Sequence, residues 1–158
     1  MIQRIQSVYL LLVALIAFFL MYFNPNYARF ENKEKANYTE LRYTSTHMFK
    51  DAEPPLSVSK WINVLVIAGI FAGSFFAIFL FKKQELQKKL AIYMALLGAL
   101  LILIMVLDYN TTSQQYKGNV NYPGIWSVMP LGIIIFSFLA WRGIRKDEAL
   151  LKSMDRIR

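Results

Sequence analysis

Four long hydrophobic segments, none with a charged residue inside it, dominate this 158-residue chain. Each has about 17 to 21 residues, and a helix needs ~20 residues to cross the ~30 Å hydrocarbon core of a bilayer. Lipid offers no hydrogen-bond partners, so a spanning segment must pair its own backbone groups, as a helix does. None of the segments alternates apolar and polar residues like a barrel strand. The sequence predicts an all-α, four-helix membrane domain with spans at 7–23, 61–81, 90–107 and 125–141.

The overall composition supports this class. Hydrophobic residues make up 56% of the chain and charged residues only 18%, against about a quarter charged in soluble domains. Such hydrophobicity excludes a largely disordered chain, and the absence of cysteine excludes disulfides. The first segment has an alternative interpretation as a secretory signal peptide, because Arg4 precedes it. No small-residue cleavage site follows, so we prefer an uncleaved span.

The basic residues predict the orientation of the spans. Loop 82–89 (KKQELQKK) contains four lysines, and the tail 142–158 contains six basic residues against three acidic ones. Short basic loops remain in the cytoplasm, so both termini and loop 82–89 are expected there. Loops 24–60 and 108–124 then lie outside. The net charge of +8 flanks the spans, which favours anionic lipid headgroups over a nucleic-acid partner.

Two spans contain small residues at a spacing of four, which marks faces where helices approach closely in lipid. The two stripes are Gly69, Gly73 and Ala77 in the second span and Ala91, Ala95 and Ala99 in the third. Because a short loop joins these spans, they form an antiparallel hairpin. We expect the two stripes to face one another, and the alternative is a dimer through the glycines of the second span.

Pro130 lies inside the fourth span. Its missing N–H leaves the carbonyl of Trp126 without its helical partner, which predicts a bend near this end of the helix. Such a kink is a packing feature in one interpretation and a gate in the other. We expect Tyr27, Tyr109 and Trp126 to anchor the outer membrane interface.

The outer loops show a β pattern. Residues 37–48 alternate and are rich in Tyr and Thr, as half-buried strands are. Tyr116, Val120 and Tyr122 have even spacing, so the second outer loop is able to pair with the first. We expect a cap of two or three strands, with Pro54 and Pro55 ending any strand before the second span.

The C-terminal tail 144–158 is expected to form an amphipathic basic helix. Its apolar stripe consists of Leu150, Met154 and Ile157. Together with Arg4 at the other terminus and with Arg145 and Lys146, this stripe is predicted to contact lipid headgroups or a partner protein.

Residues that carry chemistry are scarce. His47 is the only histidine, and no serine or cysteine motif accompanies it. Neither a metal-ligand spacing nor a phosphate-binding loop occurs, and the spans contain no ionisable group of the kind that marks proton or ion paths. Asp108 adjoins the third span and is expected to be a solvated helix end. We therefore predict no catalytic residue, no cofactor, no metal and no enzymatic activity.

The two ends of the chain carry a family resemblance. The start MIQRIQ (1–6) with YLLL (9–12), and the end RKDE (145–148) with DRIR (155–158), resemble a family of small four-span membrane proteins. That family is typical of the Bacteroidota, and its function is unknown. The resemblance implies a bacterial inner membrane with periplasmic outer loops, and it implies no activity and no site residues.

Two functions follow as hypotheses. The first is a non-enzymatic accessory or scaffold subunit of a larger membrane complex, with the bilayer and other integral membrane proteins as partners. The alternative is a small transporter, or a protein that binds a lipid or small molecule in a cleft beside Pro130.

Overall fold

The computed structural model describes residues 5–31, 37–49, 54–80, 83–115, 119–121 and 125–155. Four positions singled out in the sequence lie outside these ranges, namely Arg4, Tyr116, Tyr122 and Ile157, and so does the side chain of Met154.

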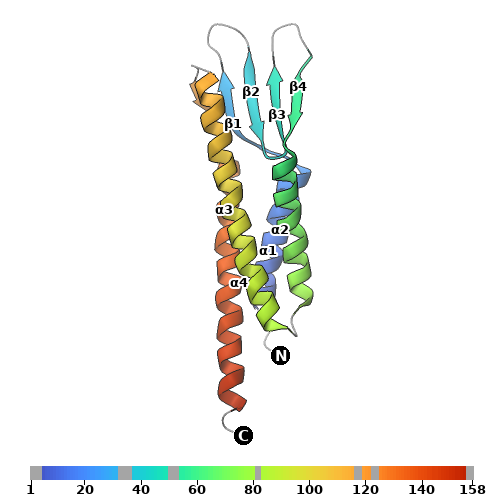
Figure 1. Cartoon of the computed structure of the whole chain (residues 1–158), viewed down its shortest axis with the longest axis vertical. Coiled ribbons are helices and arrows are strands. Elements are labelled where there is room, and N and C mark those ends of the chain that lie inside the picture. The colour runs from blue at the N-terminus through green and yellow to red at the C-terminus, as the bar shows by residue number, and fades with distance from the viewer. Residues whose placement is uncertain are drawn as a thin grey trace.

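Four helices form the body of the protein (Figure 1): α1 (Ile5–Tyr22), α2 (Trp61–Phe79), α3 (Gln84–Gln115) and α4 (Ile125–Asp155). All four are long and apolar enough to cross a membrane, and they overlap the four segments predicted from the sequence. Helix α1 packs against α2 and α4, and α3 packs against the same two helices. Large apolar side chains such as Leu65 and Phe76 remain exposed on the outside of the bundle. Apolar outer surfaces of this kind fit hydrocarbon and not water, so this is a membrane protein.

A five-stranded antiparallel sheet caps one end of the bundle. Its order is β4-β3-β2-β1-β5, with strands β1 (Asn26–Glu31), β2 (Tyr38–Arg42), β3 (Ser45–Phe49), β4 (Leu56–Ser59) and β5 (Asn119–Asn121). We call this the sheet end. Helix α1 begins and α4 ends at the opposite end, which we call the terminal end (Figure 1).

The sheet is larger than the sequence indicated. Strands β2 and β3 occupy the predicted region, and β5 pairs with β1 as expected of the second outer loop. The expectation that Pro54 and Pro55 end any strand before the second span was wrong, because β4 directly follows them. Proline is tolerated at the start of a strand and at a sheet edge, and β4 is an edge strand.

Two helices extend beyond the predicted spans. Helix α3 continues beside the sheet, where the rings of Phe30 and Tyr109 lie 5.5 Å apart. Helix α4 continues without interruption past the terminal end of the bundle to Asp155 (Figure 1). The tail is therefore a continuation of the fourth span and not a separate helix, as expected for a segment rich in Lys, Arg, Glu, Ala and Leu.

The small-residue stripes are arranged differently from our expectation. On α2, Gly69 faces Leu97 of α3, and Gly73 faces Met94. Glycines of one helix thus receive bulky side chains of the next, which leaves no void. The second stripe turns away from α2, since Ala95 and Ala99 line a groove between α3 and α4. Ala77 and Ala91 are fully buried.

The tightest glycine contact lies between α3 and α4. A methyl group added at Gly98 would lie 3.0 Å from Ile134 Cγ1 and 3.2 Å from Ile133 Cγ2. Only glycine fits this contact without displacing its neighbours. Gly98 therefore marks a close contact between α3 and α4.

Candidate functional site

The tip of the β2–β3 hairpin inserts into the sheet end of the bundle. Tyr43 is fully buried there, and its carbonyl accepts a 2.9 Å hydrogen bond from the Asn63 side chain of α2. The Thr44 amide donates to Asn24 Oδ1 at 2.8 Å, and its carbonyl accepts from the Lys60 amide at 2.8 Å. Asn24 has φ 43°, a left-handed conformation that asparagine tolerates better than most residues. The hairpin tip thus joins α1, α2 and the sheet.

Tyr43 also supplies the hydrogen bond that Pro130 removes from α4. The carbonyl of Trp126 has no helical N–H partner, because residue 130 is proline. The Tyr43 hydroxyl donates to this carbonyl. One residue further, the Ser127 hydroxyl donates to the carbonyl of Tyr27 at 2.8 Å. The first turn of α4 is therefore hydrogen-bonded to the sheet region at the carbonyl that the proline leaves without a helical donor.

A partly buried ion pair completes this junction. Lys60 Nζ donates to Asp108 Oδ2 at 2.8 Å, to the Tyr27 hydroxyl at 3.0 Å and to the Arg42 carbonyl at 3.3 Å. The Tyr27 hydroxyl in turn donates to Asp108 Oδ2 at 3.1 Å. These contacts use all three N–H donors of the ammonium group. The side chain of Lys60 is 14% exposed and that of Asp108 is 30% exposed. Asp108 is therefore not the solvated helix end that we expected.

Burial changes the protonation behaviour of this junction. Burial, followed by the charge of Asp108, raises the pKa of Tyr27 far above its ordinary value. Burial likewise raises the pKa of Tyr43. Burial lowers the pKa of Lys60, while the hydrogen bond and charge of Asp108 oppose that shift. Both tyrosines are therefore neutral hydrogen-bond donors over the physiological pH range. The junction holds the sheet against three helices.

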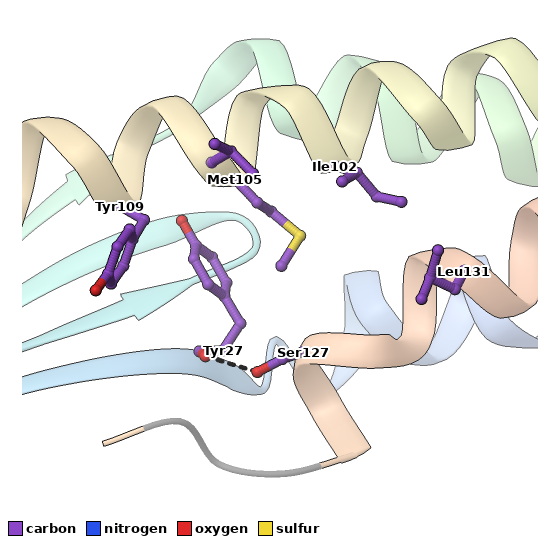
Figure 2. A pocket seen from close by; sticks show the side chains of 7 residues that line it. Tyr27, Ile102, Met105, Tyr109, Ser127 and Leu131 are labelled. Atoms are coloured by element: carbon purple, nitrogen blue, oxygen red, sulfur yellow. Dashed lines mark hydrogen bonds between the residues drawn. The ribbon is translucent and has the colours of Figure 1, made fainter. Parts of the chain in front are cut away.

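Beside the junction lies a cavity of about 250 Å³ between α3, α4 and β1 (Figure 2). Its lining is formed by Tyr27, Ile102, Met105, Val106, Tyr109, Ser127 and Leu131. Figure 2 shows the rings of Tyr27 and Tyr109 at one end and Ile102 and Leu131 at the other. Neither Lys60 nor Asp108 belongs to the lining. We call this the sheet-end cavity.

A second hollow, of about 360 Å³, follows the same two helices toward the terminal end. Its lining residues are Ala91, Ile92, Ala95, Leu96, Ala99, Ile134, Ser137, Phe138 and Trp141. We call this the terminal-end groove. Gly98 and its isoleucine partners on α4 make the close contact beside it.

The remaining predicted residues are scattered. His47 lies on β3, where its Nε2 is 2.9 Å from the Ser45 hydroxyl. Arg145, Lys146 and Leu150 lie on the extension of α4 and are exposed. Among the residues that the structure describes, no group of three or more His, Asp or Glu side chains is placed to hold a metal ion.

Sequence reasoning missed Tyr27, Tyr43 and Lys60 as members of one junction. Tyr27 and Trp126 were expected as interface anchors, yet Tyr27 is buried and Trp126 stacks on Phe19, with ring centroids 5.2 Å apart. One signal was available, because Lys60 and Asp108 are opposite charges at the sheet ends of two adjoining spans. An ion pair between neighbouring helices follows from that placement.

The chain matches the model of a family described as "Domain of unknown function (DUF4293)" over residues 2–157. It belongs to that family. The match confirms the resemblance that the two ends of the sequence carried. No curated protein matches the chain.

Proposed function

We propose that this member of the family is a non-catalytic membrane protein that binds a lipid acyl chain in the sheet-end cavity. The observation that carries the proposal is the cavity itself, which lies beside Pro130 between α3 and α4. Val106 and Leu131 line it and are about half exposed on the outside of the bundle. An acyl chain from the surrounding bilayer is therefore able to enter sideways, without crossing the sheet.

The chemistry of the lining favours an apolar ligand over a polar solute. The Ser127 hydroxyl already donates to the Tyr27 carbonyl, and the Tyr27 hydroxyl already bonds to Lys60 and Asp108. A polar solute would have to compete with these contacts. Met105 and Ile102 offer aliphatic surface, and methionine adapts to irregular apolar shapes. Binding of a hydrocarbon chain disturbs none of the hydrogen bonds at the junction.

The proposal includes an orientation and a location. Exposed basic residues lie at the terminal end, around the start of α3 and on the last part of α4. They are Lys83, Lys89, Arg142, Arg145 and Lys146. Because basic segments stay on the cytoplasmic side, both termini are cytoplasmic in this proposal. The sheet then faces the periplasm of a bacterial inner membrane, as the resemblance implied.

Native mass spectrometry of the full chain, released from mild detergent, tests the proposal. The wild type is expected to retain adducts with the mass of a lipid. Ile102→Trp fills the cavity and is expected to remove most of them. Leu103→Trp is the matched control, because Leu103 is exposed on the neighbouring position of α3 and is not part of the lining. Equal adducts in both variants would contradict the proposal.

A second candidate, the accessory subunit, is favoured by the extension of α4. This helix continues beyond the bundle at the terminal end (Figure 1), and Leu150 on it is 51% exposed. An exposed leucine on a basic helix suits a partner protein or the headgroup plane. Chemical cross-linking in intact membranes tests this candidate. A specific larger product that Lys146→Ala with Leu150→Ala removes would support it, and a chain that runs at 18.4 kDa after cross-linking would contradict it.

A further inference from the structure

The terminal-end groove has an apolar floor with small residues on one side. Ala91, Ala95 and Ala99 lie on α3, and Ile134 and Phe138 lie on α4. Side chains of these sizes leave a hollow of about 360 Å³, which lies in the range of ligand pockets. Ala99 and Phe138 are exposed on the outside of the bundle, so the groove opens to the surrounding lipid.

A buried hydroxyl in the groove wall has no partner. Ser137 is fully buried and belongs to the lining. Its Oγ has no hydrogen-bond partner among the described residues. Ser74 on α2 shows the usual arrangement, because its hydroxyl donates to the Ile70 carbonyl at 2.6 Å. An unsatisfied buried hydroxyl costs about 1–3 kcal/mol, so Ser137 provides a donor for an acceptor that enters the groove.

A cation stands at the terminal-end mouth of the groove. Trp141 is the last lining residue of α4, and the guanidinium carbon of Arg145 lies 5.5 Å from its ring centroid. Arg145 is exposed and makes no ion pair within the described part of the chain. Further toward the terminal end, Lys88 and Glu148 pair at 2.8 Å and neutralise one another. Arg145 is therefore the charge that an entering ligand meets first.

We propose that the terminal-end groove binds one anionic phospholipid from the leaflet at the terminal end. An acyl chain lies along Ala95 and Ala99, the Ser137 hydroxyl donates to the ester carbonyl, and Arg145 pairs with the phosphate. Ser137 and Trp141 are one helical turn apart, about 6 Å. Arg145 follows one turn further toward the terminal end, and its guanidinium lies over the Trp141 ring. A phospholipid places its ester and its phosphate in this order, separated by the glycerol unit.

A transmembrane helix is the competing occupant, because small residues at a spacing of four also mark helix contacts. The groove favours a lipid for two reasons. A helix is about 10 Å across with its side chains, whereas the hollow beside Leu96, Phe138 and Trp141 has a volume of only about 360 Å³. A hydrophobic helix also offers nothing that matches an unpaired guanidinium, while a phosphate matches it with charge-assisted hydrogen bonds.

Fluorescence quenching of Trp141 by brominated lipid tests the proposal on the full chain in nanodiscs. Trp61→Phe and Trp126→Phe leave Trp141 as the single tryptophan, since the chain has three. We expect half-maximal quenching at about tenfold less brominated phosphatidylglycerol than brominated phosphatidylcholine, because both lipids carry the phosphate but only phosphatidylcholine carries a choline cation that opposes the charge of Arg145. Arg145→Gln is expected to reduce this preference to less than about twofold.

Matched variants separate the groove from general effects. Ala95→Leu fills the groove and is expected to abolish the preference, whereas Ala72→Leu makes the same change on an exposed position of α2 and preserves it. Arg142→Gln removes an equal charge from a neighbouring exposed position and also preserves it. Thermal melting verifies that each variant is folded. If Ala95→Leu does not fold, Arg145→Gln still tests the proposal.

Two results would overturn the inference. One is equal quenching by both lipids in the folded single-tryptophan protein. The other is rapid disulfide formation between two Ala95→Cys chains in the membrane, which the absence of native cysteine makes readable and which would place a second copy in the groove. Neither result affects the sheet-end cavity, whose test uses Ile102, so the two proposals fail independently.

Discussion

The two ends of the bundle differ in whether their buried and partly buried polar side chains have hydrogen-bond partners. At the sheet end, the hydroxyls of Tyr27, Tyr43 and Ser127 and the ammonium of Lys60 all have partners. Among the described residues, Gln6 Nε2, Gln87 Oε1 and Ser137 Oγ of the terminal end are buried without a hydrogen-bond partner, whereas Arg29 Nε of the sheet lacks one but forms an ion pair with Glu31 at 2.8 Å. A satisfied network stabilises one arrangement, whereas unpaired donors and acceptors remain available to a ligand or water. The difference teaches that the sheet-end junction has its polar groups paired, whereas the terminal end keeps polar groups without a hydrogen-bond partner.

The largest effect is expected at Tyr43. Tyr43→Ala leaves a cavity and is expected to lower the free energy of unfolding by about 3–5 kcal/mol. Tyr43→Phe removes only the hydroxyl and is expected to cost about 1–3 kcal/mol, because the Trp126 carbonyl then remains unpaired. Titration with a denaturing detergent measures both values. Tyr22→Phe, at an exposed position, is the control and is expected to cost nothing measurable.

Pro130 sharpens this comparison. Pro130→Ala supplies the N–H that the Trp126 carbonyl lacks, so the Tyr43 hydroxyl is no longer its only donor. We expect Tyr43→Phe to cost about 1 kcal/mol less in the Pro130→Ala background than in the wild type. An identical cost in both backgrounds would show that the hairpin tip does not compensate for the proline.

The next effect is a dependence on alkaline pH. The pKa of Tyr27 is raised in the folded state above its ordinary value of 10.0, so the folded protein retains this proton where the unfolded chain loses it. The stabilisation is complete below pH 10 and is lost as the pH rises above it. Tyr27→Phe lacks this contribution, so its destabilisation relative to wild type should be smaller at pH 11 than at pH 8, by about 1 kcal/mol. Thermal melting at the two pH values measures this, and a destabilisation that does not shrink with pH would contradict the assignment.

The smallest effect compares two serines on the same helix. Ser127→Ala removes a hydrogen bond to the sheet and is expected to cost about 0.5–1.5 kcal/mol. Ser137→Ala removes a buried hydroxyl without a partner, so we expect no loss of stability and a gain of up to about 1–3 kcal/mol, measured in detergent without added phospholipid. A larger loss at Ser137 than at Ser127 would reverse our distinction between the two ends.

Much of the fold could be predicted because membrane spans depend on local composition. The four spans needed only length and hydropathy, and the strands within 37–49 needed only alternation. Strand β4 was missed although its sequence LSVS alternates apolar and polar residues, because four residues directly after two prolines are too few to predict a strand. The sequence also did not predict that Ala95 and Ala99 face the groove beside α4 instead of α2. The rotation of a helix about its axis depends on which neighbour supplies the larger side chains. Met94 and Leu97 decide that rotation by filling the space opposite Gly73 and Gly69.

The candidate sites were only partly predictable. The free carbonyl of Trp126 followed directly from Pro130, and so did a cleft beside it. The donor to that carbonyl, Tyr43, lies 83 residues away in sequence, and no local pattern connects the two. The junction of Lys60 with Asp108 required the hairpin tip to be placed between the helices, which is a tertiary property.

A crystal structure of the full chain grown from a lipid phase tests the central claim most directly. That claim is that the hollows between α3 and α4 hold lipid while the sheet-end junction stays closed. We predict elongated density in both hollows, with a headgroup beside Arg145 and an unbroken contact from Tyr43 to Trp126. A helix from another molecule in the groove, or hollows closed by movement of α4, would contradict the account.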